Sequence, residues 1–254
     1  MQAELAVLLQ ALTAAGEAVL SVRSRGFTVK EKANADVLTE ADLAADQILK
    51  NALLGAFPED GWLSEETEDN AERLNKSRVW IVDPIDGTRE FIEGIPEYAV
   101  SVALVQHGVP VLAGVYHPET KACFHAVKGE GAYRNGVRLH CRASAEPPYV
   151  LLASRSEFKR GEWVPFASQT VKVIGSIAYK LALVAAGEAD ATFSLGPKSE
   201  WDIAAGVLLV TEAGGYAGTC EGSPYVFNQA NCRVKNIAAC SEVFKTELLE
   251  LLRG

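Results

Sequence analysis

A short acidic segment in the first half of the chain has the residue types and spacing of a metal site. Asp83 follows the apolar run Trp80–Val82, which is typical of a strand, and Asp86 follows after Pro84. Two carboxylates on one tight turn can face a common point, where the carbonyl oxygen of Ile85 can join them. Mg²⁺ prefers such oxygen ligands and keeps several waters. The same residues could also form an ordinary turn, with Asp86 capping a helix.

Gly87 and Thr88 come directly after this segment and would begin a helix. The first N–H groups of a helix are unpaired and carry partial positive charge, so they can hold a phosphate group. A metal site and an anion site would then lie side by side. Phosphoryl chemistry uses this arrangement, because cations neutralise the charge that develops on the phosphoryl oxygens.

Three further acidic segments have a structural and a catalytic explanation. Glu65 lies in a polar segment that could be a solvated loop. Asp42 follows Thr39 with the spacing of a capping box at a helix start, and Asp202 has the same relation to Ser199. Taken singly, each segment favours the structural explanation.

Length and composition limit the kind of protein. The chain has 254 residues, of which 48% are hydrophobic, enough for a large core in one or two domains. The net charge of −9 disfavours a nucleic-acid polymer or an anionic membrane as partner. Bound metal ions could still admit an anionic substrate.

The cysteines and the N-terminal segment indicate a cytoplasmic location. The 5 cysteines show no C-x-x-C spacing, so neither a zinc site nor a disulfide framework is expected, and a reducing compartment is the simple interpretation. The apolar N-terminal segment carries Glu4 and Glu17. We therefore expect neither a signal peptide nor a membrane span.

Apolar periodicity predicts the elements that must position the acidic residues. Strands and helices interleave without strict βαβ repetition, which favours a layered α/β or α+β fold. Residues 68–77 are polar and are expected to form a surface loop or turn. The segment 143–148, with two prolines, is the best domain boundary, giving domains 1–145 and 146–254. Helices are expected over residues 1–24, 39–56, 176–187 and 200–213, and strands over 79–82, 99–106, 109–117, 123–127, 131–134, 150–153, 171–174, 191–195 and 237–240.

Four segments together resemble the inositol monophosphatase superfamily of Li⁺-sensitive, Mg²⁺-dependent phosphatases. They occur in the family order and are DVLTEAD (36–42), LSEE (63–66), WIVDPIDGT (80–88) and WDIAAGVLLVTEAGG (201–215). The resemblance implies an α+β fold, a layered αβαβα sandwich of the sugar-phosphatase type. An N-terminal α+β domain would carry most metal ligands, and a smaller C-terminal α/β domain would carry Asp202 and the specificity residues.

Within that superfamily the chain most resembles bacterial 3'(2'),5'-bisphosphate nucleotidases of the CysQ type. The similar segments are DGTREF (86–91), GPKSEWDIAAG (196–206) and Ser154-Arg155-Ser156, whereas residues 228–240 are not clearly similar. The implied reaction converts adenosine 3',5'-bisphosphate to AMP and phosphate. The alternatives are an inositol-1-phosphate or sugar-phosphate phosphatase and a non-catalytic binding protein on the same fold.

The resemblance also implies roles for single residues. Glu65, together with the Thr88–Asp42 pair, would orient and activate the attacking water. The Mg²⁺ ions, two or three per site, would be held by Glu65, Asp83, the Ile85 carbonyl, Asp86 and Asp202. The substrate, a small phosphate ester, would contact Gly87, Thr88, Ser154, Arg155, Lys180, Lys198 and Glu200. A homodimer is also possible, since such dimers occur in parts of the superfamily.

Overall fold

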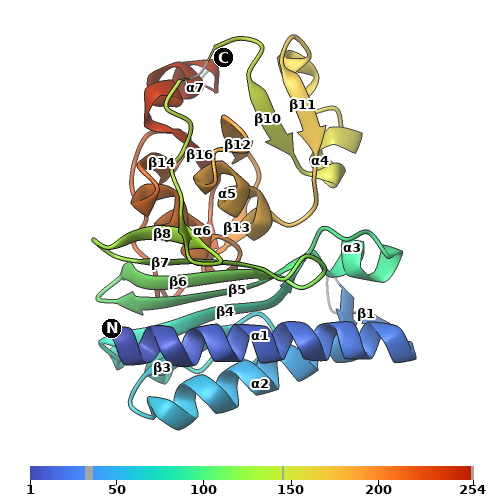
Figure 1. The fold of residues 1–254 in the computed structure, drawn as a ribbon, viewed down its shortest axis with the longest axis vertical. Helices are drawn as coiled ribbons and strands as arrows, with labels where there is room; N and C mark the ends of the chain where they lie inside the picture. Colours follow the sequence, from blue (N-terminus) through green and yellow to red (C-terminus); the bar gives the residue numbers. More distant parts are fainter. Residues whose placement is uncertain (32–36, 145, 253–254) are drawn as a thin grey trace.

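The computed structural model describes residues 1–31, 37–144 and 146–252. Asp36, in the first of the family-like segments, and Ala145, in the expected domain boundary, lie outside the described residues. The described residues form a layered α+β sandwich, which confirms the expected fold class (Figure 1). The division into domains 1–145 and 146–254 stays a prediction.

The larger sheet is built from the first half of the chain. Its seven strands lie in the order β3-β4-β5-β6-β7-β8-β9, antiparallel except for the parallel pair β3 and β4. The strands are β3 (Gly61–Ser64), β4 (Arg78–Asp86), β5 (Ala99–Gln106), β6 (Val109–His117), β7 (Ala122–Val127), β8 (Gly131–Arg134) and β9 (Val137–Arg138).

The second sheet follows in the chain and has five strands, in the order β11-β10-β12-β16-β14. They are β10 (Val150–Ala153), β11 (Thr170–Val173), β12 (Ala191–Ser194), β14 (Gly215–Gly218) and β16 (Ile237–Ser241). The described residues also form two separate two-stranded sheets. One pairs β1 (Val29–Glu31) with β2 (Val37–Thr39), and the other pairs β13 (Lys198–Ser199) with β15 (Arg233–Val234).

Helices separate and cover the two sheets (Figure 1). The pair α1 and α2 covers one face of the larger sheet, and α5 and α6 lie between the sheets. Helix α7 packs on β16 at the outer face of the second sheet. The helices are α1 (Gln2–Arg25), α2 (Glu40–Ala56), α3 (Thr88–Glu93), α4 (Arg155–Lys159), α5 (Ile177–Ala185), α6 (Glu200–Glu212) and α7 (Lys245–Leu251), with short 3₁₀ turns at Ala71–Asn75, Val164–Phe166 and Glu242–Phe244.

Strand β5 shows why the larger sheet has a helix layer on each face. Its side chains alternate between the two faces, as strand geometry requires. Val100, Val102 and Leu104 join the core beneath α1 and α2. Ala99 and Ala103 join the other core, which includes α5 and α6. Both faces are buried, which explains the nearly continuous apolar run in this part of the sequence.

Helices α5 and α6 approach each other closely at Gly206. A Cβ atom at this position would lie 2.3 Å from Cδ1 and 2.5 Å from Cβ of Leu181. The missing side chain therefore lets α6 pack against α5 and the larger sheet, where its first turn carries Asp202.

Helix α1 is long and apolar enough to cross a membrane by length and composition. In the structure it packs against α2 and β6 and contributes Leu8, Leu12 and Val19, each fully buried, to the core. The apolar character of α1 is therefore explained by packing inside this fold.

One local expectation needs correction. Strand β4 extends to Asp86, four residues beyond the expected end at Val82, because pairing with β5 resumes at Asp86 after an irregularity. The polar segment 68–77 forms a mostly exposed 3₁₀ turn, as expected, although Arg73 within it is only 3% exposed. Arg73 is buried because Asp69 and Asn228 accept hydrogen bonds from its guanidinium group.

Candidate active site

The irregular end of β4 brings the first two acidic residues to one side of the sheet. Asp83 pairs with Ser101 and Asp86 with Ala99, and the register shifts between them. Gly87 follows with a φ of 102°, a left-handed conformation that glycine adopts without strain. A Cβ atom there would also lie 3.0 Å from the Glu97 carbonyl oxygen. Glycine therefore allows the chain to leave the strand and enter α3.

Thr88 begins α3 and is joined to the acidic start of α2. Its hydroxyl oxygen lies 3.0 Å from Oδ1 of Asp42 and 3.0 Å from the carbonyl oxygen of Ile85. Oδ2 of Asp42 meanwhile accepts hydrogen bonds from the N–H and hydroxyl of Thr39. Asp42 thus caps its helix and also contacts Thr88, so the cap does not prevent the contact that the catalytic explanation requires.

Glu65 reaches the site because β3 lies parallel to β4. Ser64 at the end of β3 is level with Val82, and the N–H of Glu65 donates to the Val82 carbonyl at 3.2 Å. Glu65 therefore leaves its strand beside Asp83. Asp202 arrives from the first turn of α6, where its Oδ2 accepts the N–H of Ser199 at 2.7 Å.

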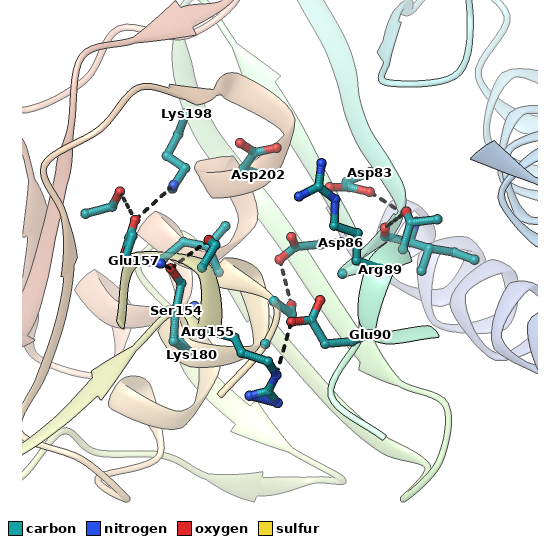
Figure 2. A pocket seen from close by; sticks show the side chains of 18 of the residues that line it. Asp83, Asp86, Arg89, Glu90, Ser154, Arg155, Glu157, Lys180, Lys198 and Asp202 are labelled. Atoms are coloured by element: carbon teal, nitrogen blue, oxygen red, sulfur yellow. Dashed lines mark hydrogen bonds and ion pairs between the residues drawn. The ribbon is translucent and has the colours of Figure 1, made fainter. Parts of the chain in front are cut away.

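Glu65, Asp83, Asp86 and Asp202 line one pocket of about 280 Å³ (Figure 2). The structure brings together the predicted ligands Glu65, Asp83, Ile85, Asp86 and Asp202. Asp42 is fully buried behind Thr88. The remaining lining residues are Gly87, Thr88, Arg89, Glu90, Ser154, Arg155, Ser156, Glu157, Gly175, Ser176, Ile177, Lys180, Ser194 and Lys198.

The carboxylates in this pocket are crowded and poorly solvated. Burial raises the pKa of Asp83 well above its ordinary value, and the neighbouring charges of Glu65 and Asp86 raise it further. Burial and the charge of Asp86 raise the pKa of Asp202 to about 7. Buried carboxylates are costly unless a cation compensates them.

This donor set fits a divalent cation with oxygen ligands. Within residues 1–31, 37–144 and 146–252, no group of three or more Asp, Glu, His or Cys side chains is already gathered tightly enough to hold a metal ion. Mg²⁺ suits the site, because it binds through a few carboxylates and keeps waters for the rest of its shell.

The opposite wall of the pocket is basic and rich in hydroxyl groups (Figure 2). Lys180 is 2% exposed and donates to the carbonyl oxygen of Ile174 at 3.2 Å. Burial lowers the pKa of Lys180 to about 8. Lys198 lies 3.4 Å from Oε1 of Glu157. Ser154 caps α4 by accepting the N–H of Glu157. An acidic pole and a basic pole therefore face each other across the pocket.

Like Lys180 and Lys198, the predicted substrate contacts Glu200 and Arg155 have partners within the protein. Glu200 is 1% exposed, and its carboxylate accepts the backbone N–H groups of Asn228 at 2.6 Å and Gln229 at 2.9 Å. Glu200 lies outside the lining of this pocket, which corrects the expectation that it accepts a substrate hydroxyl. Arg155 lines the pocket, but its guanidinium group pairs with Glu97.

Ser176 is a site residue that the sequence did not suggest. Its hydroxyl donates to Oδ2 of Asp86 at 2.6 Å, and the N–H of Ala178 donates to the same oxygen at 2.5 Å. Ser176 has a φ of 58°, which is strained for a residue with a side chain. The Gly175-Ser176 step before a helix was the only hint. Arg89, Glu90, Ser156, Glu157 and Ser194 also line the pocket without having been predicted.

Comparison with known proteins decides the family. The family model for the inositol monophosphatase family matches residues 1–253. The chain belongs to the inositol monophosphatase family. Its members are metal-dependent phosphatases, so this family member is an enzyme of that class. This result confirms the superfamily that the four sequence segments indicated.

Relatives of this family member cover nearly the whole chain. An inositol-1-monophosphatase of Caulobacter vibrioides is 36% identical over 238 residues, covering 89% of this chain and 91% of the relative. A Nus factor SuhB of Pseudomonas aeruginosa is 35% identical over 243 residues, covering 88% of each chain. The solved structure of the extragenic suppressor protein suhB from Bartonella henselae is 31% identical, with a TM-score of 0.85, covering 99% of this chain and 98% of that one.

Other relatives carry the same kinds of name: an inositol monophosphatase of Mesembryanthemum crystallinum is 31% identical over 98% of this chain.

Proposed function

We propose that this enzyme hydrolyses the phosphate monoester of a small polyol, with inositol 1-phosphate as the first candidate. The observation that carries the proposal is the meeting of Glu65, Asp83, Asp86 and Asp202 at one pocket, next to the Thr88–Asp42 pair. The inositol-1-monophosphatase of C. vibrioides, 36% identical, supports the choice of substrate.

Glu65, Asp83, Asp86, Asp202 and the carbonyl oxygen of Ile85 are the groups that would hold two or three Mg²⁺ ions. When bound, Mg²⁺ supplies positive charge for the phosphoryl oxygens and makes water a better nucleophile near neutral pH. Because the chain resembles a superfamily of Li⁺-sensitive phosphatases, we also expect Li⁺ to inhibit this enzyme.

The residues beside the metal site would orient and deprotonate the attacking water. Thr88 donates its single hydroxyl hydrogen to Asp42 or to Ile85, so the lone pairs of its oxygen can accept a hydrogen bond from water. Glu65, at the end of β3, would take the proton of that water as a general base. The N–H groups of Gly87 and Thr88 would hold phosphoryl oxygens.

A substrate panel tests this proposal. We expect Mg²⁺-dependent phosphate release, with a kcat/KM for inositol 1-phosphate about 10-fold or more above that for adenosine 3',5'-bisphosphate, a gap of roughly 1.4 kcal/mol in transition-state stabilisation. Addition of Li⁺ to the same assay tests the expected inhibition. Absence of phosphate release from every ester in the panel would instead favour a non-catalytic binding role.

The basic wall of the pocket favours a second candidate function, that of a 3'(2'),5'-bisphosphate nucleotidase. Lys180 and Lys198 face the acidic pole and could hold a second phosphate group, with Ser154 nearby. The Lys198→Met variant separates the two candidates. For a nucleotidase, the variant should lower kcat/KM for the bisphosphate by about 10-fold, as loss of a charge-assisted hydrogen bond predicts, and leave inositol 1-phosphate nearly unaffected.

A cytoplasmic location and a homodimer both stay predictions. Sedimentation of the purified protein would determine whether the enzyme is a monomer or a dimer.

A further inference from the structure

A second buried carboxylate on α2 contacts the segment that carries Glu65. Asp46 lies one helical turn after Asp42, so both project from the same face of the helix. Asp46 is 8% exposed. Its Oδ1 accepts the hydroxyl hydrogen of Ser64 at 2.5 Å, and its Oδ2 accepts that of Thr67 at 2.8 Å. The two hydrogen bonds lie on either side of Glu65 in the sequence.

These bonds form one clamp on a short segment. The hydroxyl of Ser64 also accepts the N–H of Glu66 at 3.3 Å, and the N–H of Glu65 is held by the Val82 carbonyl. Hydrogen bonds from hydroxyl groups to a carboxylate are charge-assisted and therefore stronger than neutral ones. The backbone around Glu65 is thus tied both to β4 and to Asp46 of α2.

The site needs such a clamp because Glu65 faces other acids. Glu65 lines the same pocket as Asp83 and Asp202. Like charges repel, so the segment that carries Glu65 needs support if its carboxylate is to stay beside the other two. A loop that must be ordered at the moment of binding lowers the affinity by the free energy of that ordering.

We propose that Asp46 is a positioning residue that holds the Ser64–Thr67 segment so that Glu65 faces the Mg²⁺ site. The proposal rests on the proposed function, because it assumes that Glu65 is a metal ligand. Helix α2 then serves the site twice: Asp42 orients Thr88, and Asp46 orients Glu65 through two hydroxyl groups. Neither the family match nor any of the sequence segments above assigns a role to Asp46.

Direct Mg²⁺ binding, measured by calorimetry without substrate, is the test. Outer-shell partners of metal ligands typically change metal affinity by about 10–100-fold. We expect Asp46→Asn and Thr67→Val each to raise the Kd for Mg²⁺ by about 10-fold. Thr67→Ser keeps the hydroxyl and should bind Mg²⁺ like the wild type. Gln47→Ala, an exposed change on the same helix, should also leave the Kd unchanged.

Together, the Asp46→Asn and Thr67→Val variants distinguish an effect of the hydrogen bonds from an effect of the negative charge. Asp46→Asn removes a negative charge near the site, whereas Thr67→Val keeps that charge and removes only a hydrogen bond. A raised Kd in both supports the clamp. A raised Kd in Asp46→Asn alone shows that charge is the cause and overturns the proposal. Should Asp46→Asn fail to fold, Thr67→Val and Ser64→Ala decide the question between them.

The dependence of kcat on the Mg²⁺ concentration provides a second measurement. At saturating Mg²⁺ the Thr67→Val variant should regain a kcat close to that of the wild type, because Glu65 returns to its position once the cation is bound. A kcat that stays low at every Mg²⁺ concentration would contradict a positioning role. If the wild type itself binds no Mg²⁺, both the proposed function and the clamp fail; unchanged affinity in the variants alone removes only the clamp.

Discussion

The hydroxyl of Ser176, at the start of α5, donates a hydrogen bond of 2.6 Å to Oδ2 of Asp86, at the end of β4. The N–H of Ala178 donates to the same oxygen. Because Oδ2 already accepts two hydrogen bonds, Oδ1 is the atom of Asp86 best suited to a cation. The contact also joins the larger sheet to the helix layer between the sheets.

Removal of the Ser176 hydroxyl should weaken metal binding. We expect Ser176→Ala to raise the Mg²⁺ concentration needed for half-maximal activity by about 10-fold, as for other outer-shell partners. Ser176→Gly also lacks the hydroxyl but tolerates the positive φ, so it should be as poor a metal binder while unfolding at a higher temperature than Ser176→Ala. Activity titrations with Mg²⁺ and thermal unfolding of both variants check this prediction.

The variant Asp83→Asn should lose turnover and bind Mg²⁺ weakly while staying folded. Asp83 is 1% exposed among other carboxylates, so the neutral amide removes a buried charge that the metal-free protein tolerates poorly. Circular dichroism should match the wild type, and phosphate release should fall to background. Mg²⁺-dependent activity close to normal would disprove the assignment of this residue.

The stability of the metal-free protein should fall as the pH rises from about 4 to about 7. Asp202 has a raised pKa of about 7, whereas in the unfolded chain it titrates near its ordinary value of about 4. Between these values the folded state binds the proton that the unfolded state has released, so a rise in pH favours unfolding.

Thermal unfolding in EDTA at several pH values measures this effect. The variant Asp202→Asn should show a smaller decrease in Tm over the same range, because its side chain does not titrate. For a chain of this length, 1 kcal/mol corresponds to roughly 2–4 °C in Tm. Equal pH dependence in the variant and the wild type would show that Asp202 is not the group responsible.

Thr88→Val should lower kcat with little change in KM. The variant keeps the shape of the side chain but cannot hydrogen-bond Asp42 or the attacking water, and misplacement of a reacting group typically costs about 10²-fold. Thr88→Ser retains the hydroxyl and should keep most of the activity. Steady-state kinetics at saturating Mg²⁺ compare the two, and a Val variant as active as the Ser variant would exclude the role of the hydroxyl.

Glu200→Gln should destabilise the protein without changing substrate affinity. The carboxylate holds the backbone N–H groups of Asn228 and Gln229 inside the fold, and an amide of the same shape can accept with one oxygen only. We expect a loss of roughly 1–3 kcal/mol in the free energy of unfolding. The KM for inositol 1-phosphate should stay within about twofold of the wild type, a free-energy change of less than about 0.5 kcal/mol.

The sequence predicted those parts of the site that depend on local pattern. The capping spacing at Asp42 and Asp202 is a short-range feature, and the structure has both residues in the first turn of their helices. The expected turn from Asp83 to Asp86 is instead an irregularity within β4. The helices and most strands could likewise be predicted, because apolar periodicity reports which face is buried.

The partners that lie far apart in sequence could not be predicted in this way. The pairing of Arg155 with Glu97 arises only because the fold brings α4 beside the segment after α3. The burial of Glu200 depends on the loop at Asn228, and that of Arg73 on the same loop. A single sequence carries no signal for such long-range pairs.

The two poles of the pocket come from different parts of the fold. Glu65 follows β3, and Asp83 and Asp86 belong to β4 of the larger sheet, whereas Lys180 lies on α5 and Lys198 on the separate strand β13. Replacement of basic side chains there can alter which ester enters the pocket while the hydrolytic groups stay untouched. This separation gives an evolutionary route by which proteins of one ancestry acquire new substrates without rebuilding their chemistry.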